Sequence, residues 1–143
     1  MSDQFGPKRP LGVTIVAALA IVSGAFDIIG GIALLATQST PEVADAFGGA
    51  ALATTLAIVE IAIGIIMLVI AYGLLRGNAI SRIAATVVQV ISLAGSIWIG
   101  IAQPSTLATE IVSALVALAI LMLLWTGEAT RYFKGLAPDE PTS

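Results

Sequence analysis

Residues 50–75 read AALATTLAIVEIAIGIIMLVIAYGLL, a mostly apolar run in which Glu60 is the one charged side chain. A helix rises about 1.5 Å per residue, so this run is long enough to cross about 30 Å of hydrocarbon. Runs of similar character fall at 11–36, 80–102 and 106–125. The sequence therefore predicts an all-α protein with four transmembrane helices.

Composition supports the same class. The chain has 143 residues, of which 58% are hydrophobic and 10% charged, whereas soluble domains carry about 25% charged residues. A soluble domain of this length exposes too much surface to hide so many apolar side chains. The chain has no cysteine and no histidine, which excludes disulfides, thiol catalysis and imidazole chemistry. Its net charge of −3 gives no reason to expect a nucleic-acid partner.

The first apolar run follows Lys8 and Arg9 and so has the charge pattern of a signal peptide. It is about twice as long as the apolar part of a signal peptide, and no small-x-small cleavage site follows it. We therefore interpret it as a retained span. The predicted organisation is a disordered cytoplasmic segment at 1–10, a transmembrane domain at 11–126, and a tail at 127–143 that is first interfacial and then disordered.

The segments between the spans carry helix start and stop residues. Thr40 precedes Pro41 and predicts a helix start before the second span, which the glycines at 48 and 49 could interrupt. Gly77 followed by Asn78 predicts the end of one helix and the cap of the next. Pro104 ends the third span, after which Ser105 or Thr106 can cap the fourth.

Charge placement predicts the orientation. All six basic residues fall on one side of a four-span scheme, whereas Glu42 and Asp45 fall on the other side, with Glu110 at its edge. By the positive-inside rule both termini are cytoplasmic, and the short loops predict an up-down-up-down antiparallel bundle in the plasma membrane. Several basic and aromatic residues are expected to anchor the cytoplasmic interface: Arg76, Arg82, Trp125, Arg131 and Lys134.

Asp27 and Glu60 are the most informative residues, because each lies well inside an apolar span. A charge near the bilayer centre costs about 3 kcal/mol or more, so such groups are paired, protonated or functional. In antiparallel neighbours both carboxyls lie roughly 15 Å below the outer boundary. If they face each other, they share a proton or hold a cation. Two alternatives remain open, which are protonated acids that hydrogen-bond between helices and contacts to another subunit.

The third span carries polar and small residues at three- and four-residue spacing, namely Gln89, Ser92, Ser96, Gly100 and Gln103. This stripe indicates either a narrow polar pathway or close helix packing with a few interhelical hydrogen bonds. Gly73 and Gly77 form a GxxxG motif, which packs helices within a chain or between subunits. The residues predicted to pack helices are Ser23, Gly31, Gly64, Gly73, Gly77 and Gly100.

No phosphate-binding loop, dinucleotide fingerprint, metal-ligand cluster or nucleophile elbow is present in the sequence. We expect no enzymatic activity, no cofactor and no metal. The leading hypothesis is a structural or accessory membrane protein that contacts lipids and packs with itself or with other membrane protein subunits. The first alternative is a proton or cation channel or transporter that uses Asp27 and Glu60, with Gln89, Ser92 and Ser96 along the route. The second alternative is binding of a lipid or apolar ligand between helices.

Residues 9–35, which begin RPLGVTIVAALAIVSGAFDIIGGIALL, and the later segment AYGLLRGNAISRIAATVVQVISL resemble small four-helix membrane proteins common in actinobacteria. In those proteins an Arg-Pro-x-Gly opens the first span, as at Arg9, Pro10 and Gly12. A Gly-Leu-x-Arg-Gly turn closes the second span, as at 73–77, and an arginine begins the third, as at Arg82. The resemblance implies the four-helix membrane fold and no established activity.

Overall fold

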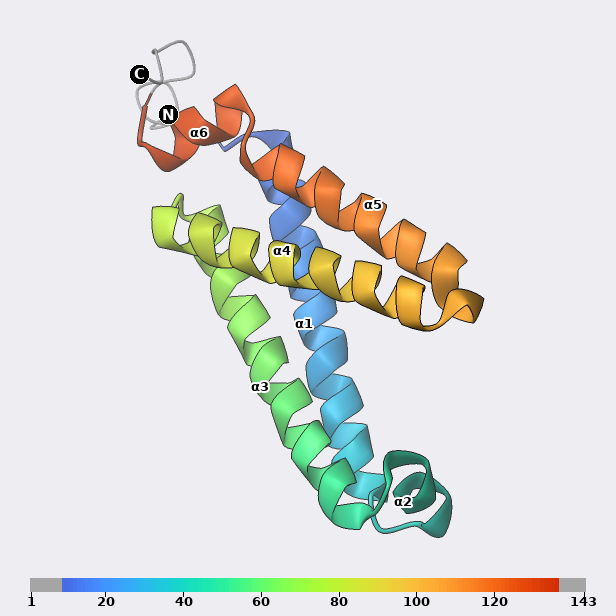
Figure 1. The fold of residues 1–143 in the computed structure, drawn as a ribbon. Helices are drawn as coiled ribbons and strands as arrows, with labels where there is room; N and C mark the ends of the chain where they lie inside the picture. The colour runs from blue at the N-terminus through green and yellow to red at the C-terminus, as the bar shows by residue number, and fades with distance from the viewer. Residues whose placement is uncertain (1–8, 137–143) are drawn as a thin grey trace. The chain divides into compact units, whose positions relative to one another are not determined.

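The computed structural model describes residues 9–136, and these contain helices and turns but no strand (Figure 1). Predictions that concern residues 1–8, Lys8 among them, and residues 137–143 lie outside this range. The helices are α1 (Leu11–Thr37), α2 (Pro41–Phe47), α3 (Ala50–Leu75), α4 (Ala79–Ala102), the short 3₁₀ helix η2 (Pro104–Thr106), α5 (Leu107–Leu124) and α6 (Gly127–Phe133).

Four segments within the described range are long and apolar enough to cross a membrane: Leu11–Thr37, Ala50–Leu75, Ala79–Ala102 and Pro104–Leu124. The predicted all-helical class with four membrane-crossing helices is therefore confirmed at this level. Each of the four expected spans coincides with one of these segments to within one or two residues at either end.

The link between α1 and α3 contains a short extra helix. Thr40 occupies the N-cap position of α2, but its hydroxyl donates to the carbonyl oxygen of Thr37 (2.8 Å) and does not cap the helix. The predicted helix start at Thr40 and Pro41 is confirmed, although the Thr40 side chain makes no capping hydrogen bond. Gly48 has a φ of 80° and Gly49 a φ of 125°, which is backbone that only glycine adopts without strain. The predicted interruption at these glycines is confirmed.

The other two links follow the sequence signals more closely. Gly77 has a φ of 74°, and the side-chain oxygen of Asn78 accepts from the backbone N–H groups of Ile80 (2.8 Å) and Ser81 (3.4 Å), as predicted. Beyond α4, which ends at Ala102 just before Pro104 as predicted, Pro104 begins η2. Thr106 occupies the N-cap position of α5, as predicted, but its hydroxyl donates back to the carbonyl oxygen of Gln103 (2.8 Å) and makes no capping hydrogen bond.

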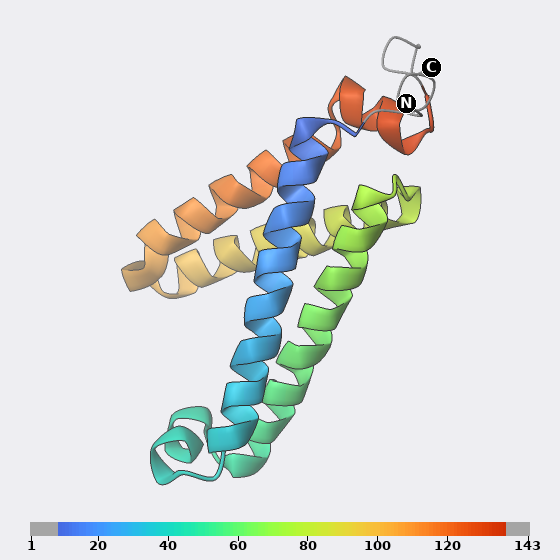
Figure 2. The ribbon, with the colours of Figure 1, turned by 180° about the vertical axis from the view of Figure 1, so that it is seen from behind.

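The described residues form two compact units. We call residues 18–71 the central unit and residues 9–17 together with 72–136 the terminal unit. In the central unit α1 and α3 lie side by side, and in the terminal unit α4 and α5 do so, as both ribbon views show (Figures 1 and 2). The terminal unit also holds α6, the first turns of α1 and the last residues of α3.

Glycines allow the close approach of α1 and α3. A Cβ atom at Gly24 would lie 2.7 Å from the carbonyl oxygen of Gly64, and one at Gly31 would lie 2.7 Å from that of Ala57. The contact runs from Gly24 to Gly31 along α1 and from Gly64 back to Ala57 along α3, so residue numbers rise on one helix as they fall on the other. Because any side chain at these positions would meet backbone, the two helices depend on glycine for their separation.

The core of the terminal unit lies where four helix ends meet. Leu74 at the end of α3, Leu124 at the end of α5 and Val13 at the start of α1 are fully buried. Ala129, Tyr132 and Phe133 of α6 are buried beside them. The tail helix is therefore packed into this core, and the interfacial position expected for this segment stays a prediction.

Candidate functional site

Asp27 and Glu60 both lie along the contact between α1 and α3. A Cβ atom at Gly64 would lie 3.1 Å from the Cβ of Asp27, and one at Gly30 would lie 3.0 Å from Oε1 of Glu60. Each acid therefore rests over a glycine of the opposite helix. The missing side chain at that glycine provides the space that the acid occupies.

Neither carboxyl is enclosed. Asp27 and Glu60 are both half-buried, and within residues 9–136 neither makes a hydrogen bond or ion pair with another group of the chain. One alternative in the sequence analysis was that protonated acids hydrogen-bond between helices of the chain. The described part of the chain contains no such hydrogen bond from Asp27 or Glu60. In hydrocarbon, an unbonded polar group costs several kcal/mol.

The polar stripe of α4 is not uniform in its surroundings. Gln89 is half-buried, Ser92 is exposed, and Ser96 and Gly100 are buried. A Cβ atom at Gly100 would lie 3.3 Å from Leu107 Cδ1 and 3.5 Å from Glu110 Cβ. The buried part of the stripe, at Ser96 and Gly100, therefore faces α5, whereas Ser92 is exposed.

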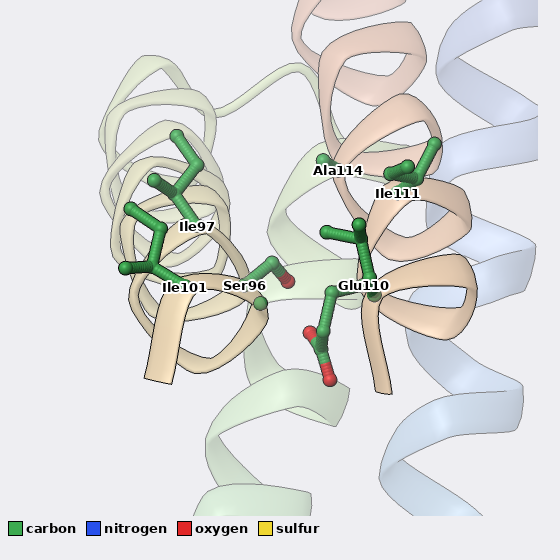
Figure 3. A pocket seen from close by; sticks show the side chains of 8 residues that line it. Ser96, Ile97, Ile101, Glu110, Ile111 and Ala114 are labelled. Atoms are coloured by element: carbon green, nitrogen blue, oxygen red, sulfur yellow. The ribbon is translucent and has the colours of Figure 1, made fainter. Parts of the chain in front are cut away.

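A cavity of about 200 Å³ lies between α4 and α5 near η2. Figure 3 shows Ser96 and Glu110 extending into the space between the helices from opposite sides. The rest of the lining is glycine, alanine and aliphatic side chains, including Ile97 and Leu107. The cavity is thus an apolar groove with one half-buried carboxylate beside it.

Arg82 of the terminal unit is a buried arginine with two hydrogen bonds and two aromatic contacts. It is 6% exposed. Its Nε donates to the carbonyl oxygen of Leu124 (2.9 Å) and its Nη2 to the hydroxyl of Thr130 (2.8 Å). The guanidinium carbon lies 3.6 Å from the centroid of the Trp125 ring and 5.3 Å from that of Phe133. The structure buries this arginine against the C-terminal end of α5, and its role as an interface anchor stays a prediction.

Burial without a carboxylate partner is costly for a cation, and the surroundings of Arg82 offset that cost. The last carbonyls of a helix lack intrahelical donors and carry partial negative charge, so Leu124 is a favourable acceptor. The face of an indole ring attracts a guanidinium. The Trp125 N–H in turn donates to the hydroxyl of Thr86 (2.9 Å), which fixes the ring.

The remaining predicted anchors differ in exposure. Arg76 is exposed and donates to the hydroxyl of Tyr72 (2.9 Å). Trp125 is 52% exposed, and Lys134 is exposed at the end of α6. Arg131 is half-buried, and its Nε is buried without a hydrogen-bond partner.

Tyr132 joins α6 to the end of α3. Its hydroxyl lies 3.1 Å from the carbonyl oxygen of Leu74 and 2.7 Å from that of Leu75. Arg9 donates to the same Leu75 oxygen (2.9 Å). Burial raises the pKa of the Tyr132 phenol, and the nearby charge and hydrogen bond of Arg9 oppose this rise. The α3 C-terminus is thus satisfied by two side chains that are distant in sequence.

The predicted packing residues separate into two groups. Gly31, Gly64, Gly73 and Gly100 are buried, whereas Ser23 is exposed and Gly77 is half-buried. A Cβ atom at Gly73 would overlap Ser81, and one at Gly77 would lie 3.3 Å from Cζ of Tyr132. In the structure the GxxxG motif therefore packs within the terminal unit.

Sequence reasoning missed two features, the Glu110 groove and the burial of Arg82. A signal for the first was available, because Gly100 and Glu110 lie equally far along the chain from Ser105. Two helices joined by a short turn bring such positions together. No comparable signal marked Arg82, since its partners come from the tail helix as well as from α5.

A family described as "Domain of unknown function (DUF7144)" matches residues 12–128. The chain belongs to this family. The part matched to DUF7144 includes Asp27, Glu60, the groove beside Glu110 and the Arg82–Trp125 pair, and it ends within α6 before Tyr132. No curated protein and no solved structure matches the chain. The DUF7144 family description contains no activity.

Proposed function

We propose that this DUF7144 protein is a structural or accessory protein of the plasma membrane that packs with itself or with another membrane protein. It crosses the membrane four times as an up-down-up-down antiparallel bundle, with both termini in the cytoplasm, and it is not an enzyme. The resemblance to small four-helix membrane proteins of actinobacteria belongs to the same proposal.

The orientation is supported by the terminal unit. Arg9 reaches the carbonyl oxygen of Leu75, next to Arg76, and Arg82 reaches Thr130, next to Arg131. Four arginines therefore gather where the ends of α1, α3, α4 and α5 meet. Cytoplasmic loops are enriched in such residues, and anionic lipid headgroups attract them.

The packing role rests on one observation, namely that Asp27 and Glu60 lie half-exposed on adjoining helices with no bonded partner in the described chain. A polar side chain in lipid gains about 1 kcal/mol from a hydrogen bond to another helix. A second copy of the chain, or a different membrane protein with a donor at that depth, supplies that bond. Protonated carboxyls serve as both donor and acceptor, so two copies can pair with each other.

Native mass spectrometry of the protein, gently extracted from its own membranes, tests this proposal. We expect a homo-oligomer or a stoichiometric complex with another membrane protein. If the extracted protein is instead a monomer that carries only lipid and detergent, the proposal is contradicted. Flux measurements on liposomes then separate packing from conduction, because the packing role predicts no pH-dependent flux above that of empty vesicles.

A further inference from the structure

The groove between α4 and α5 has a composition that neither packing nor orientation explains. Its volume is about 200 Å³, and its carbon lining includes Ile97, Ile101, Leu107, Ile111 and Ala114 (Figure 3). Pockets for drug-sized ligands begin at about 300 Å³. The space is therefore smaller than a pocket for a drug-sized ligand, and its carbon lining suits a hydrocarbon chain.

Glu110 gives the groove a charge preference. It lies in the first turn of α5 and packs on Gly100, where a Cβ atom would lie 3.5 Å from the Cβ of the acid. Within residues 9–136 its carboxylate forms no ion pair. The four described arginines gather around the other ends of α4 and α5, where Arg82 meets Leu124. An ionised carboxylate beside an apolar surface favours a cation as its neighbour.

We propose that this groove binds a single-chain alkylammonium amphiphile, with the hydrocarbon chain between α4 and α5 and the ammonium group at the Glu110 carboxylate. The occupant enters from the bilayer, since Ile97, Ile101 and Leu107 are 55%, 74% and 48% exposed on helices that are apolar enough to span a membrane. Ser96 lies across the groove from Glu110 (Figure 3).

The geometry separates two contributions to binding. The carboxylate recognises the charge, and the aliphatic walls recognise the chain. A neutral amphiphile with the same chain therefore occupies the groove more weakly than the ammonium compound. Removing the charge of Glu110 abolishes the difference between the two compounds, whereas filling the groove weakens both.

Dodecyltrimethylammonium and the neutral dodecyl maltoside are suitable probes, and native mass spectrometry counts the molecules retained by the full chain. We expect the wild type to retain one ammonium molecule. Glu110→Gln should weaken its retention about tenfold or more without changing the retention of the neutral probe. Ala114→Leu should weaken both. Glu42→Gln, which alters an acid of α2, serves as the matched control and should change neither.

Equal retention of the two probes by the wild type overturns the proposal. So does an unchanged preference in Glu110→Gln, or unchanged retention in Ala114→Leu, because either result places the ligand elsewhere. The oligomeric state is read in the same spectra. A wild-type protein that is monomeric but still binds the ammonium probe contradicts the proposed packing function and leaves the groove proposal intact. The two proposals can therefore fail independently.

Discussion

The guanidinium of Arg82 lies 3.6 Å above the indole ring of Trp125, in a cluster that joins α4, α5 and α6. The stack brings together a residue of the first turn of α4 and the residue that follows α5. The α4 turn also carries the Asn78 cap, so this end of the terminal unit is fixed by both backbone and side-chain hydrogen bonds. Arg82 therefore stabilises the unit as well as adding to its charge bias.

Replacing Arg82 by lysine keeps the charge but cannot reproduce the two directed hydrogen bonds and the stacked plane. We expect Arg82→Lys to lower the free energy of unfolding in mild detergent by about 2 kcal/mol. Arg76→Lys alters an exposed arginine and should cost less than about 0.5 kcal/mol. Equal losses in the two variants would show that the Arg82 cluster contributes no special stability.

Tyr132 gives the terminal unit a dependence on alkaline pH. Burial raises the pKa of its phenol above that of the unfolded chain, so folding favours the neutral form. The stabilisation is complete below the unfolded pKa of about 10 and is lost as pH rises through the higher folded value. Between pH 8 and pH 11, the melting temperature of the wild type should therefore fall more steeply than that of Tyr132→Phe. Tyr72→Phe, at an exposed phenol, is the control and should keep the wild-type slope.

The contact between α1 and α3 depends on the absence of side chains at its glycines. We expect Gly24→Ala to destabilise the protein by about 1–3 kcal/mol, because its Cβ would meet the Gly64 carbonyl oxygen at 2.7 Å. A Cβ atom at Gly95 meets nothing within 4 Å. Gly95→Ala should therefore be neutral or slightly stabilising, since alanine is the better helix former. The free energy of unfolding of each variant checks the difference.

The absence of cysteine makes the orientation simple to measure. Ala46→Cys places a thiol at an exposed position of α2, and Ala79→Cys places one at the exposed start of α4. A membrane-impermeant maleimide should label the first variant in intact cells and the second only after lysis. The reverse pattern would place the termini outside, and labelling of both variants in intact cells would contradict an odd number of spans between the two sites.

Hydrophobic length and turn residues were enough to predict the four membrane-length helices. Gly77, Asn78 and Pro104 act over a few residues, so their effect is visible in the sequence alone. The surroundings of the polar side chains were harder to predict, since Arg82 is buried by Thr130 and Phe133 from a distant helix. The bounds of the apolar runs placed Asp27 and Glu60 at similar depth on neighbouring spans, but they could not reveal that each acid rests over a glycine of the other helix. That detail depends on the rotation of each helix about its axis.

The packing role of Asp27 and Glu60 depends on hydrogen bonding and not on ionisation, which a pair of double variants can separate. Asp27→Asn with Glu60→Gln keeps polar groups of similar size, whereas Asp27→Leu with Glu60→Leu removes them. Each lost interhelical hydrogen bond should weaken association about fivefold. The matched exposed site Glu42→Leu should leave association unchanged.

Native mass spectrometry of these two double variants, extracted from their membranes beside the wild type, is the decisive comparison. We expect the amide variant to retain the oligomer or partner complex and the leucine variant to lose most of it. Equal association of the leucine variant and the wild type would contradict the proposed packing role of these carboxyls.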